Sequence, residues 1–125
     1  MVEAAFALPV LLVMIWGIFQ FGVAMHANAG MQNALGEGAR LATLCVNPTL
    51  ATGCGRPTDA QIVTRMGDRR FGTGYGSFGT PTVTPGPATE KYITLAVNYT
   101  IPLNFLFFPG PNITFRQTKR VYVAG

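Results

Sequence analysis

The chain opens with a long block of apolar residues, from Ala4 to Met25, that contains no charged side chain. Glu3 stands directly before this block, and Gln20 is the only strongly polar residue within it. As a helix, the block would extend about 33 Å, slightly more than the ~30 Å hydrocarbon core of a bilayer. A helix that is apolar on every side must be covered by lipid or by protein, and the remaining chain is too short to enclose it. Lipid or other copies of the chain are therefore expected around it.

Helical character continues beyond this block. Apolar or small residues recur at helical spacing at Met31, Ala34, Leu35, Gly38 and Ala42. This pattern predicts one helix over residues 3–44, apolar all round in its first half and amphipathic in its second. Pro9 removes one backbone hydrogen bond in the first half, which favours either a kink or a local loosening of the helix there. The frequent glycines and alanines favour close packing between helices.

The middle of the chain combines helix-ending residues with one short helical segment. The loop that follows residue 44 is rich in proline and glycine. Thr58 and Asp59 then offer an N-cap for a helix over residues 59–69, with Ile62, Val63 and Met66 on one face. Residues 71–81 form a glycine-rich aromatic loop, which lacks the lysine of a phosphate-binding loop.

The last third of the chain predicts strands. Residues 81–84 form a short candidate, and residues 92–101 alternate between apolar and polar side chains, as in a half-buried strand. Pro102 is expected to end that strand, an apolar turn follows over 103–111, and a final strand covers 112–123. Two to four antiparallel strands against a helix make an α+β fold. We therefore expect a long helix over 1–44 and a small α+β domain over 45–125, packed on the amphipathic half of the helix.

The expected turn is unusually apolar, because four large side chains follow one another from Phe105 to Phe108. Such a cluster promotes aggregation unless something covers it. A neighbouring subunit could cover Phe105, Phe107 and Phe108, or the cluster could fold back into the core of the domain.

Cys45 and Cys54 are the two cysteines of the chain, and their spacing does not suit a metal site. A disulfide between them would close a small loop, worth roughly 2.5–3 kcal/mol by the chain-entropy estimate, and would imply an oxidising compartment. The alternative is a pair of buried free thiols.

The net charge is +4, and all nine Lys and Arg residues fall between Arg40 and Arg120. They are scattered, which favours a solvated surface over nucleic-acid binding. The apolar block is also too long for a typical secretory signal and lacks a basic residue before it, although a removed signal remains an alternative.

Residues that could carry chemistry are scarce. His26 is the one histidine, and the five acidic residues form no close pair in the sequence. We expect no enzyme activity, no catalytic residue, no metal and no cofactor. Asn98 and Asn112 match glycosylation sequons within predicted strands, a pattern that is common by chance.

Glu3 is the exception, because a carboxylate at the edge of an apolar helix is costly to bury without a cation. The free N-terminal amine of a neighbouring, staggered chain could supply that cation. Alternatively, Glu3 lies among lipid headgroups or interacts with the dipole of its own helix.

The first 40 residues resemble the TadE-like pilins, a tight-adherence branch of the type IV pilin superfamily. The resemblance rests on short motifs in order: Val2-Glu3, Ala7-Leu8-Pro9, the segment 17–22 (GIFQFG), Gln32-Asn33-Ala34 and the segment 37–40 (EGAR). It implies a precursor whose short basic leader is removed by a prepilin peptidase. It also implies an inner-membrane intermediate whose C-terminal part lies outside the cytoplasm. An ATPase-driven platform would then assemble this intermediate into an extracellular helical filament.

The resemblance implies that Glu3 guides the docking of a new subunit through a neighbour's amine. Many relatives carry this glutamate fifth after the cut rather than third, so either Met1 is not the mature terminus or processing differs. The apolar helices would form the filament core, packed through Leu8, Pro9, Leu11, Leu12, Ile15, Trp16, Phe19 and Phe21. The expected function is a structural pilin for surface attachment. The alternatives are a minor pilin or pseudopilin of a tight-adherence system, or a membrane-anchored extracytoplasmic binding module.

Overall fold

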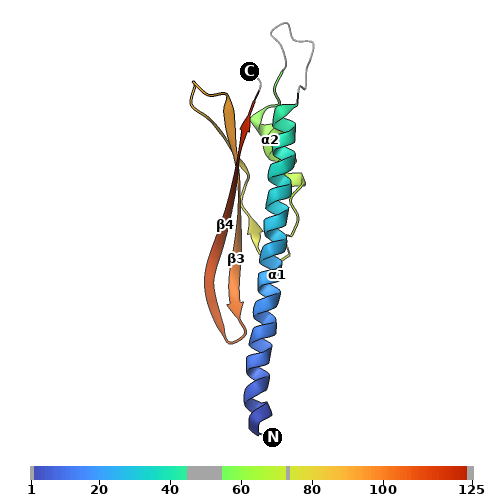
Figure 1. The fold of residues 1–125 in the computed structure, drawn as a ribbon, viewed down its shortest axis with the longest axis vertical. Helices are drawn as coiled ribbons and strands as arrows, with labels where there is room; N and C mark the ends of the chain where they lie inside the picture. Colours follow the sequence, from blue (N-terminus) through green and yellow to red (C-terminus); the bar gives the residue numbers. More distant parts are fainter. Residues whose placement is uncertain (1, 45–54, 73, 124–125) are drawn as a thin grey trace.

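A computed structural model of the chain describes residues 2–44, 55–72 and 74–123. Its longest element, α1, is a helix that runs from Val2 to Thr43 without interruption and passes through Pro9. The N-terminal end of α1 projects beyond the rest of the molecule, and its C-terminal half lies against the sheet and the second helix (Figure 1). The single long helix expected over residues 3–44 is thus confirmed.

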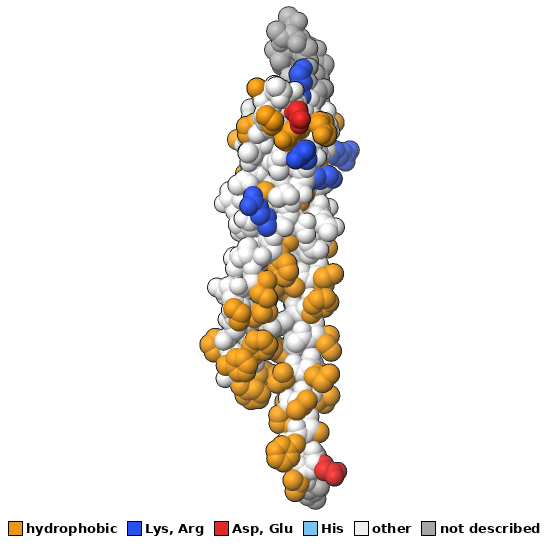
Figure 2. All heavy atoms as spheres, turned by 60° about the vertical axis from the view of Figure 1, so that its left-hand side comes forward, with side chains coloured by type: hydrophobic (Ala, Val, Ile, Leu, Met, Phe, Trp, Pro, Cys, Tyr) orange, Lys and Arg blue, Asp and Glu red, His pale blue; other side chains and the backbone are white. Residues whose placement is uncertain are grey.

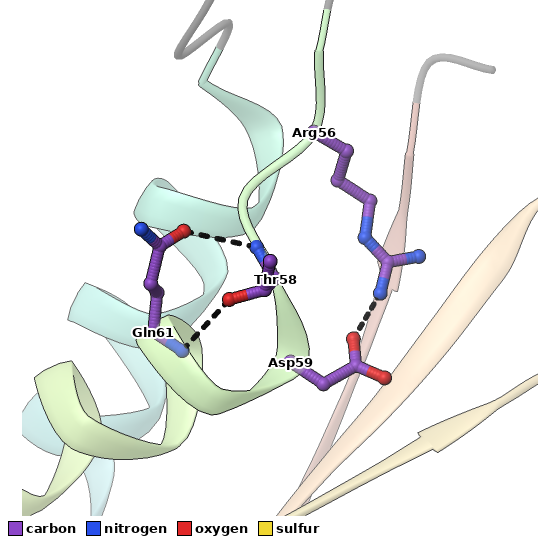
Figure 3. Close-up of polar contacts among 4 residues, drawn as sticks. All are labelled: Arg56, Thr58, Asp59 and Gln61. Atoms are coloured by element: carbon purple, nitrogen blue, oxygen red, sulfur yellow. Dashed lines mark hydrogen bonds and ion pairs between the residues drawn. The ribbon is translucent and has the colours of Figure 1, made fainter.

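The second helix, α2 (Asp59–Asp68), begins at the N-cap that the sequence predicts. The Thr58 hydroxyl accepts a hydrogen bond from the backbone N–H of Gln61 at 3.3 Å (Figure 3). In return, the Gln61 side-chain oxygen accepts one from the N–H of Thr58 at 3.0 Å (Figure 3). This reciprocal capping box satisfies two N–H groups that have no partner within the helix. Arg56 pairs with Asp59 beside it (Figure 3).

The sheet is antiparallel and has β3 at its centre. Its strands are β1 (Ser77–Phe78), β2 (Thr82–Pro85), β3 (Tyr92–Phe105) and β4 (Phe108–Tyr122). β4 pairs along one edge of β3, whereas β2 and then β1 pair with successive parts of its other edge. The predicted α+β fold is confirmed, with four strands in the described part of the chain.

The long hairpin of β3 and β4 reaches further than expected. Pro102 does not end β3, contrary to the prediction: the strand continues through it, and Pro102 pairs with Asn112 of β4. The turn expected over 103–111 therefore shrinks to the two residues between the strands. Pairing with β1 ends at Thr100, so β3 is an edge strand at Pro102. Proline is tolerated on such an edge, because no second strand requires its N–H.

A smaller correction concerns the glycine-rich segment 71–81, which is not entirely a loop. β1 lies within it and pairs with Tyr99 and Thr100 of β3. A strand of this length carries no periodic pattern, so only its pairing with β3 reveals it.

The hydrophobic core lies between the C-terminal half of α1, α2 and one face of the sheet. The α1 residues that recur at helical spacing are all buried: Met31, Ala34, Leu35, Gly38 and Ala42. The alternating residues of β3 are also buried: Ile93, Leu95, Val97, Tyr99 and Ile101. Ile62 and Met66 of α2 complete the core, with Val63 half-buried beside them. Both predicted periodicities are confirmed, and the sheet packs on the amphipathic half of α1.

Tyr99 is the largest fully buried side chain among the described residues. Its burial raises the pKa of the phenol above its ordinary value, although a backbone hydrogen bond with Gly76 opposes this shift. Nearby, Gly72 adopts a φ of 84° and lies close to the backbone of Ala27, where a side chain would not fit.

Candidate assembly surface

The N-terminal half of α1 is bare. By length and composition α1 could cross a membrane, and none of its most apolar 18-residue window is buried. The residues predicted to pack in a filament core lie in this half: Leu8, Pro9, Leu11, Leu12, Ile15, Trp16, Phe19 and Phe21. Of these, Trp16 is half-buried and the others are exposed. Their packing against neighbouring helices stays a prediction.

Glu3 lies in the first turn of α1 and is exposed. A carboxylate in this position interacts favourably with the helix dipole. In the part of the chain that the structure describes, the ion pairs are Arg56–Asp59 and Arg65–Glu37, and neither involves Glu3. Its predicted role in docking therefore requires a cation from outside these residues.

The tip of the β3–β4 hairpin reaches one face of α1 within its N-terminal half, at Trp16 and Gln20. The carbonyl oxygen of Asn104 accepts a hydrogen bond from Trp16 Nε1 at 2.7 Å and a second from Gln20 Nε2. Gln20 is only 6% exposed, although it lies in the apolar block. Trp16, Phe19 and Tyr75 form an aromatic cluster beside this contact. Sequence reasoning missed this junction, and the signal for it was Gln20, the one strongly polar side chain in the block.

The hairpin tip is the second bare apolar surface. Phe105, Leu106, Phe107 and Phe108 are 38%, 52%, 73% and 62% exposed. The rings of Phe105 and Phe108 lie 4.9 Å apart, and neither they nor their neighbours fold back into the core. Figure 2 shows hydrophobic side chains gathered over this tip and over the adjacent length of α1, with the basic side chains spread over the opposite half of the molecule.

The glycines of α1 fall into two groups. A Cβ on Gly30 would lie 2.1 Å from the backbone oxygen of Phe71, and one on Gly38 would clash with Met66. These two glycines let the helix approach the rest of the molecule. In contrast, nothing lies within 4 Å of a Cβ added to Gly17, Gly22 or Gly36. The latter three are free to face a neighbouring helix.

His26 is the remaining candidate for chemistry among the described residues. His26 lies against Phe71, with 5.3 Å between ring centroids. It lines an open, mostly apolar groove of about 630 Å³ together with Phe19, Gly22, Val23, Gly72, Gly74 and Tyr75. No group of three His, Cys, Asp or Glu residues in the described ranges could hold a metal ion.

Two other predictions concern the cysteines and the glycosylation sequons. Cys45 and Cys54 lie outside the described residues, so their disulfide stays a prediction. The sequon residues Asn98 and Asn112 lie in β3 and β4, as expected, and both are exposed.

Comparison with known families agrees with the N-terminal motifs. Residues 1–40 match a family described as TadE-like protein. No curated protein and no solved structure matches the chain. The match covers the N-terminal third of the chain, which carries the TadE-like motifs and the bare apolar part of α1.

Proposed function

Because the N-terminal third of this chain is TadE-like, we propose that it is a structural pilin subunit that polymerises through α1 into an extracellular filament used for surface attachment. One observation carries the proposal. A single uninterrupted helix has a bare apolar half and a second half locked into the core of the molecule. Such a helix connects a buried filament core directly to a domain on the filament surface.

The bare half cannot stand in water. Covering one large apolar side chain is worth about 1.5–3 kcal/mol, so leaving the exposed leucines, isoleucines, valines and phenylalanines of α1 in water would cost tens of kcal/mol. A bilayer can cover them before assembly. On leaving the bilayer they must bury one another, and a heterologous contact that does not close on itself repeats into a helical polymer.

The proposed life cycle follows from the resemblance. A prepilin peptidase would remove a leader, and the chain would reside in the bacterial inner membrane with residues 45–125 on the extracytoplasmic side. An assembly platform with its ATPase would then add subunits to a homo-oligomeric filament at the cell surface. An oxidising compartment would also favour the proposed Cys45–Cys54 disulfide. The proposal assigns no catalytic role, no cofactor and no nucleic-acid partner to the chain.

Glu3 is proposed to select the docking position. In the apolar core of a filament, its carboxylate would be stable beside the N-terminal amine of an adjacent subunit, because a buried charge needs a paired, hydrogen-bonded partner. Its exposure in the single subunit leaves it accessible for that contact.

Replacing Glu3 tests this role. Glu3→Gln and Glu3→Ala should insert into the membrane normally, because neither adds a charge, but should give few or no filaments in material sheared from cells. Glu90→Gln is the matched control, since it removes an exposed carboxylate far along the chain and should assemble normally. Normal filament yield from both Glu3 variants would refute the docking role. Loss of the variants from the membrane fraction would show that Glu3 acts in insertion.

The alternatives predict other outcomes in the same experiment. A minor pilin or pseudopilin would appear in sheared filaments only in small amounts beside another major subunit. A membrane-anchored binding module would stay in the membrane fraction and would not polymerise.

A further inference from the structure

We propose that, before assembly, the tip of the β3–β4 hairpin, residues 103–111, is inserted among the lipid acyl chains of the leaflet nearest the domain. The hairpin would be a second membrane contact beside α1. This inference rests on the membrane stage of the proposed function and does not depend on polymerisation.

The length of α1 places the hairpin tip at membrane depth. Glu3 limits how far the helix can sink, because its carboxylate resists the hydrocarbon core. A hydrocarbon core about 30 Å thick takes up about 20 helical residues, so it extends from Ala4 to about Val23. The exposed apolar surface of α1 continues through this range to Phe21, which is 67% exposed, so the turn between Trp16 and Val23 lies at membrane depth. This turn contains Gln20, which contacts the carbonyl of Asn104 at the hairpin tip. A membrane that covers α1 completely thus also covers the residues beyond Asn104.

The hairpin is uncharged and apolar toward its tip. Between Lys91 and Arg116 the chain has no charged residue. The far end of this stretch exposes Phe105 to Phe108, and Ile113 of β4 is 39% exposed above them. Figure 2 shows that this surface is continuous with the apolar side chains of α1, and that the charged side chains lie away from it apart from an acidic group at the N-terminal end. Because this exposed apolar surface continues the apolar surface of α1, the lipid that covers α1 can cover the hairpin tip as well.

The backbone of the tip is suited to hydrocarbon, which does not tolerate unsatisfied N–H and C=O groups. Pro102, Pro109 and Pro111 have no N–H to satisfy. Phe105 pairs with Phe108 and Asn104 with Pro109 across the hairpin. The carbonyl of Asn104 also accepts hydrogen bonds from two α1 side chains. The tip therefore exposes fewer backbone donors to lipid than an ordinary strand end would.

The hairpin tip lies deeper than its contact with the helix. Asn104 accepts a hydrogen bond from Trp16 at this contact, and from there the tip points toward the N-terminal end of α1 (Figure 1). When the hydrocarbon covers α1 from Ala4 to about Val23, Trp16 lies within it, so the residues beyond Asn104 lie there as well.

The experiment uses the full chain in phospholipid vesicles, with few chains per vesicle. Trp16 is the only tryptophan, so the native chain reports on the depth of the helix. The double variant Trp16→Phe/Phe107→Trp moves the only tryptophan to the tip. The matched control Trp16→Phe/Tyr122→Trp moves it to the opposite end of β4, where Tyr122 is 67% exposed. Trp16→Phe/Leu106→Trp replaces the tip reporter if the first variant misfolds. Circular dichroism establishes that each variant is folded.

Fluorescence is then quenched from two sides, by brominated phospholipids and by aqueous iodide. The inference predicts that the tip reporter is quenched by brominated lipid, is shielded from iodide and emits at shorter wavelength than the control. The control should be quenched by iodide and unaffected by brominated lipid.

Three results would overturn the inference, and they differ in what else they mean. If iodide quenches the tip reporter while brominated lipid quenches native Trp16, the helix is inserted and only the hairpin proposal fails. If brominated lipid does not quench Trp16 either, the membrane stage of the proposed function fails as well. If the tip is shielded from both quenchers and dilution of the chain in lipid removes the shielding, another copy of the chain covers it instead.

Discussion

Exchange of Gly30 and Gly36 for alanine should change stability in opposite directions. Both glycines lie in α1, six residues apart. A Cβ on Gly30 would lie 2.1 Å from the carbonyl oxygen of Phe71 and 3.0 Å from its carbonyl carbon. A Cβ on Gly36 would meet nothing within 4 Å. Comparison of the two variants therefore separates the effect of the contact between α1 and Phe71 from the higher helix propensity of alanine.

The sizes of the two effects follow from these distances. Alanine stabilises a helix interior by about 1 kcal/mol relative to glycine. Gly36→Ala should gain about this much, because no contact opposes it. Overpacking costs about 1–3 kcal/mol, and Gly30→Ala should reach the upper end because a backbone carbonyl cannot rotate away like a side chain. After the helix gain is subtracted, Gly30→Ala should lose about 2 kcal/mol, so the two variants should differ by about 3 kcal/mol.

Thermal unfolding of the full chain in detergent micelles measures this difference. The near-UV circular dichroism of the tyrosines reports on the packed domain rather than on the helix in the micelle. The unfolding temperatures of the two variants should lie on opposite sides of the parent value and about 10 °C or more apart. Equal stabilisation by both alanines would refute the close approach of α1 to Phe71.

Four further predictions concern the domain and assembly. Removal of residues 1–19 should leave a fragment that is folded by NMR in detergent micelles, whereas removal of 1–44 should abolish folding, because α1 supplies part of the core; a folded 45–125 fragment would contradict this. Thr58→Ala should lower stability in thermal unfolding by about 1 kcal/mol through loss of the cap of α2, and an unchanged unfolding temperature would contradict the capping role. Gly17→Leu should reduce the yield of sheared filaments without changing the unfolding temperature, since nothing in the described part of the subunit lies within 4 Å of a Cβ at this position; normal filaments would show that Gly17 lies outside any helix contact. The raised pKa of Tyr99 predicts that stability falls as pH rises above 10, because the unfolded state releases the phenolic proton first. A pH titration of the unfolding temperature checks this, and Tyr99→Phe should reduce the fall.

Local signals in the sequence predicted much of the fold. The buried stripe of α1 follows from helical spacing, and the buried face of β3 follows from alternation, because each pattern reflects one face turned toward the core. The start of α2 follows from Thr58, whose hydroxyl caps the helix whatever lies around it. These features depend on residues that are close together in the sequence.

Features that depend on distant partners could not be predicted in this way. Pro102 is a strand breaker in isolation, and it is tolerated because no described strand pairs with that edge of β3 beyond Thr100. Gln20 was visible as a polar exception, but its partner, the carbonyl of Asn104, lies 84 residues away. The division of the α1 glycines into domain-facing and open positions likewise requires the folded structure.

Fractionation of sheared cell-surface material tests most directly the claim that this chain forms a filament through α1. The pelleted material would be imaged by electron microscopy, and the mass of the intact subunit would be measured. The account predicts filaments in which this chain is the dominant protein, and the mass would also define its mature N-terminus and the state of Cys45 and Cys54. Sheared material without this chain, together with its retention in the membrane fraction, would contradict the account.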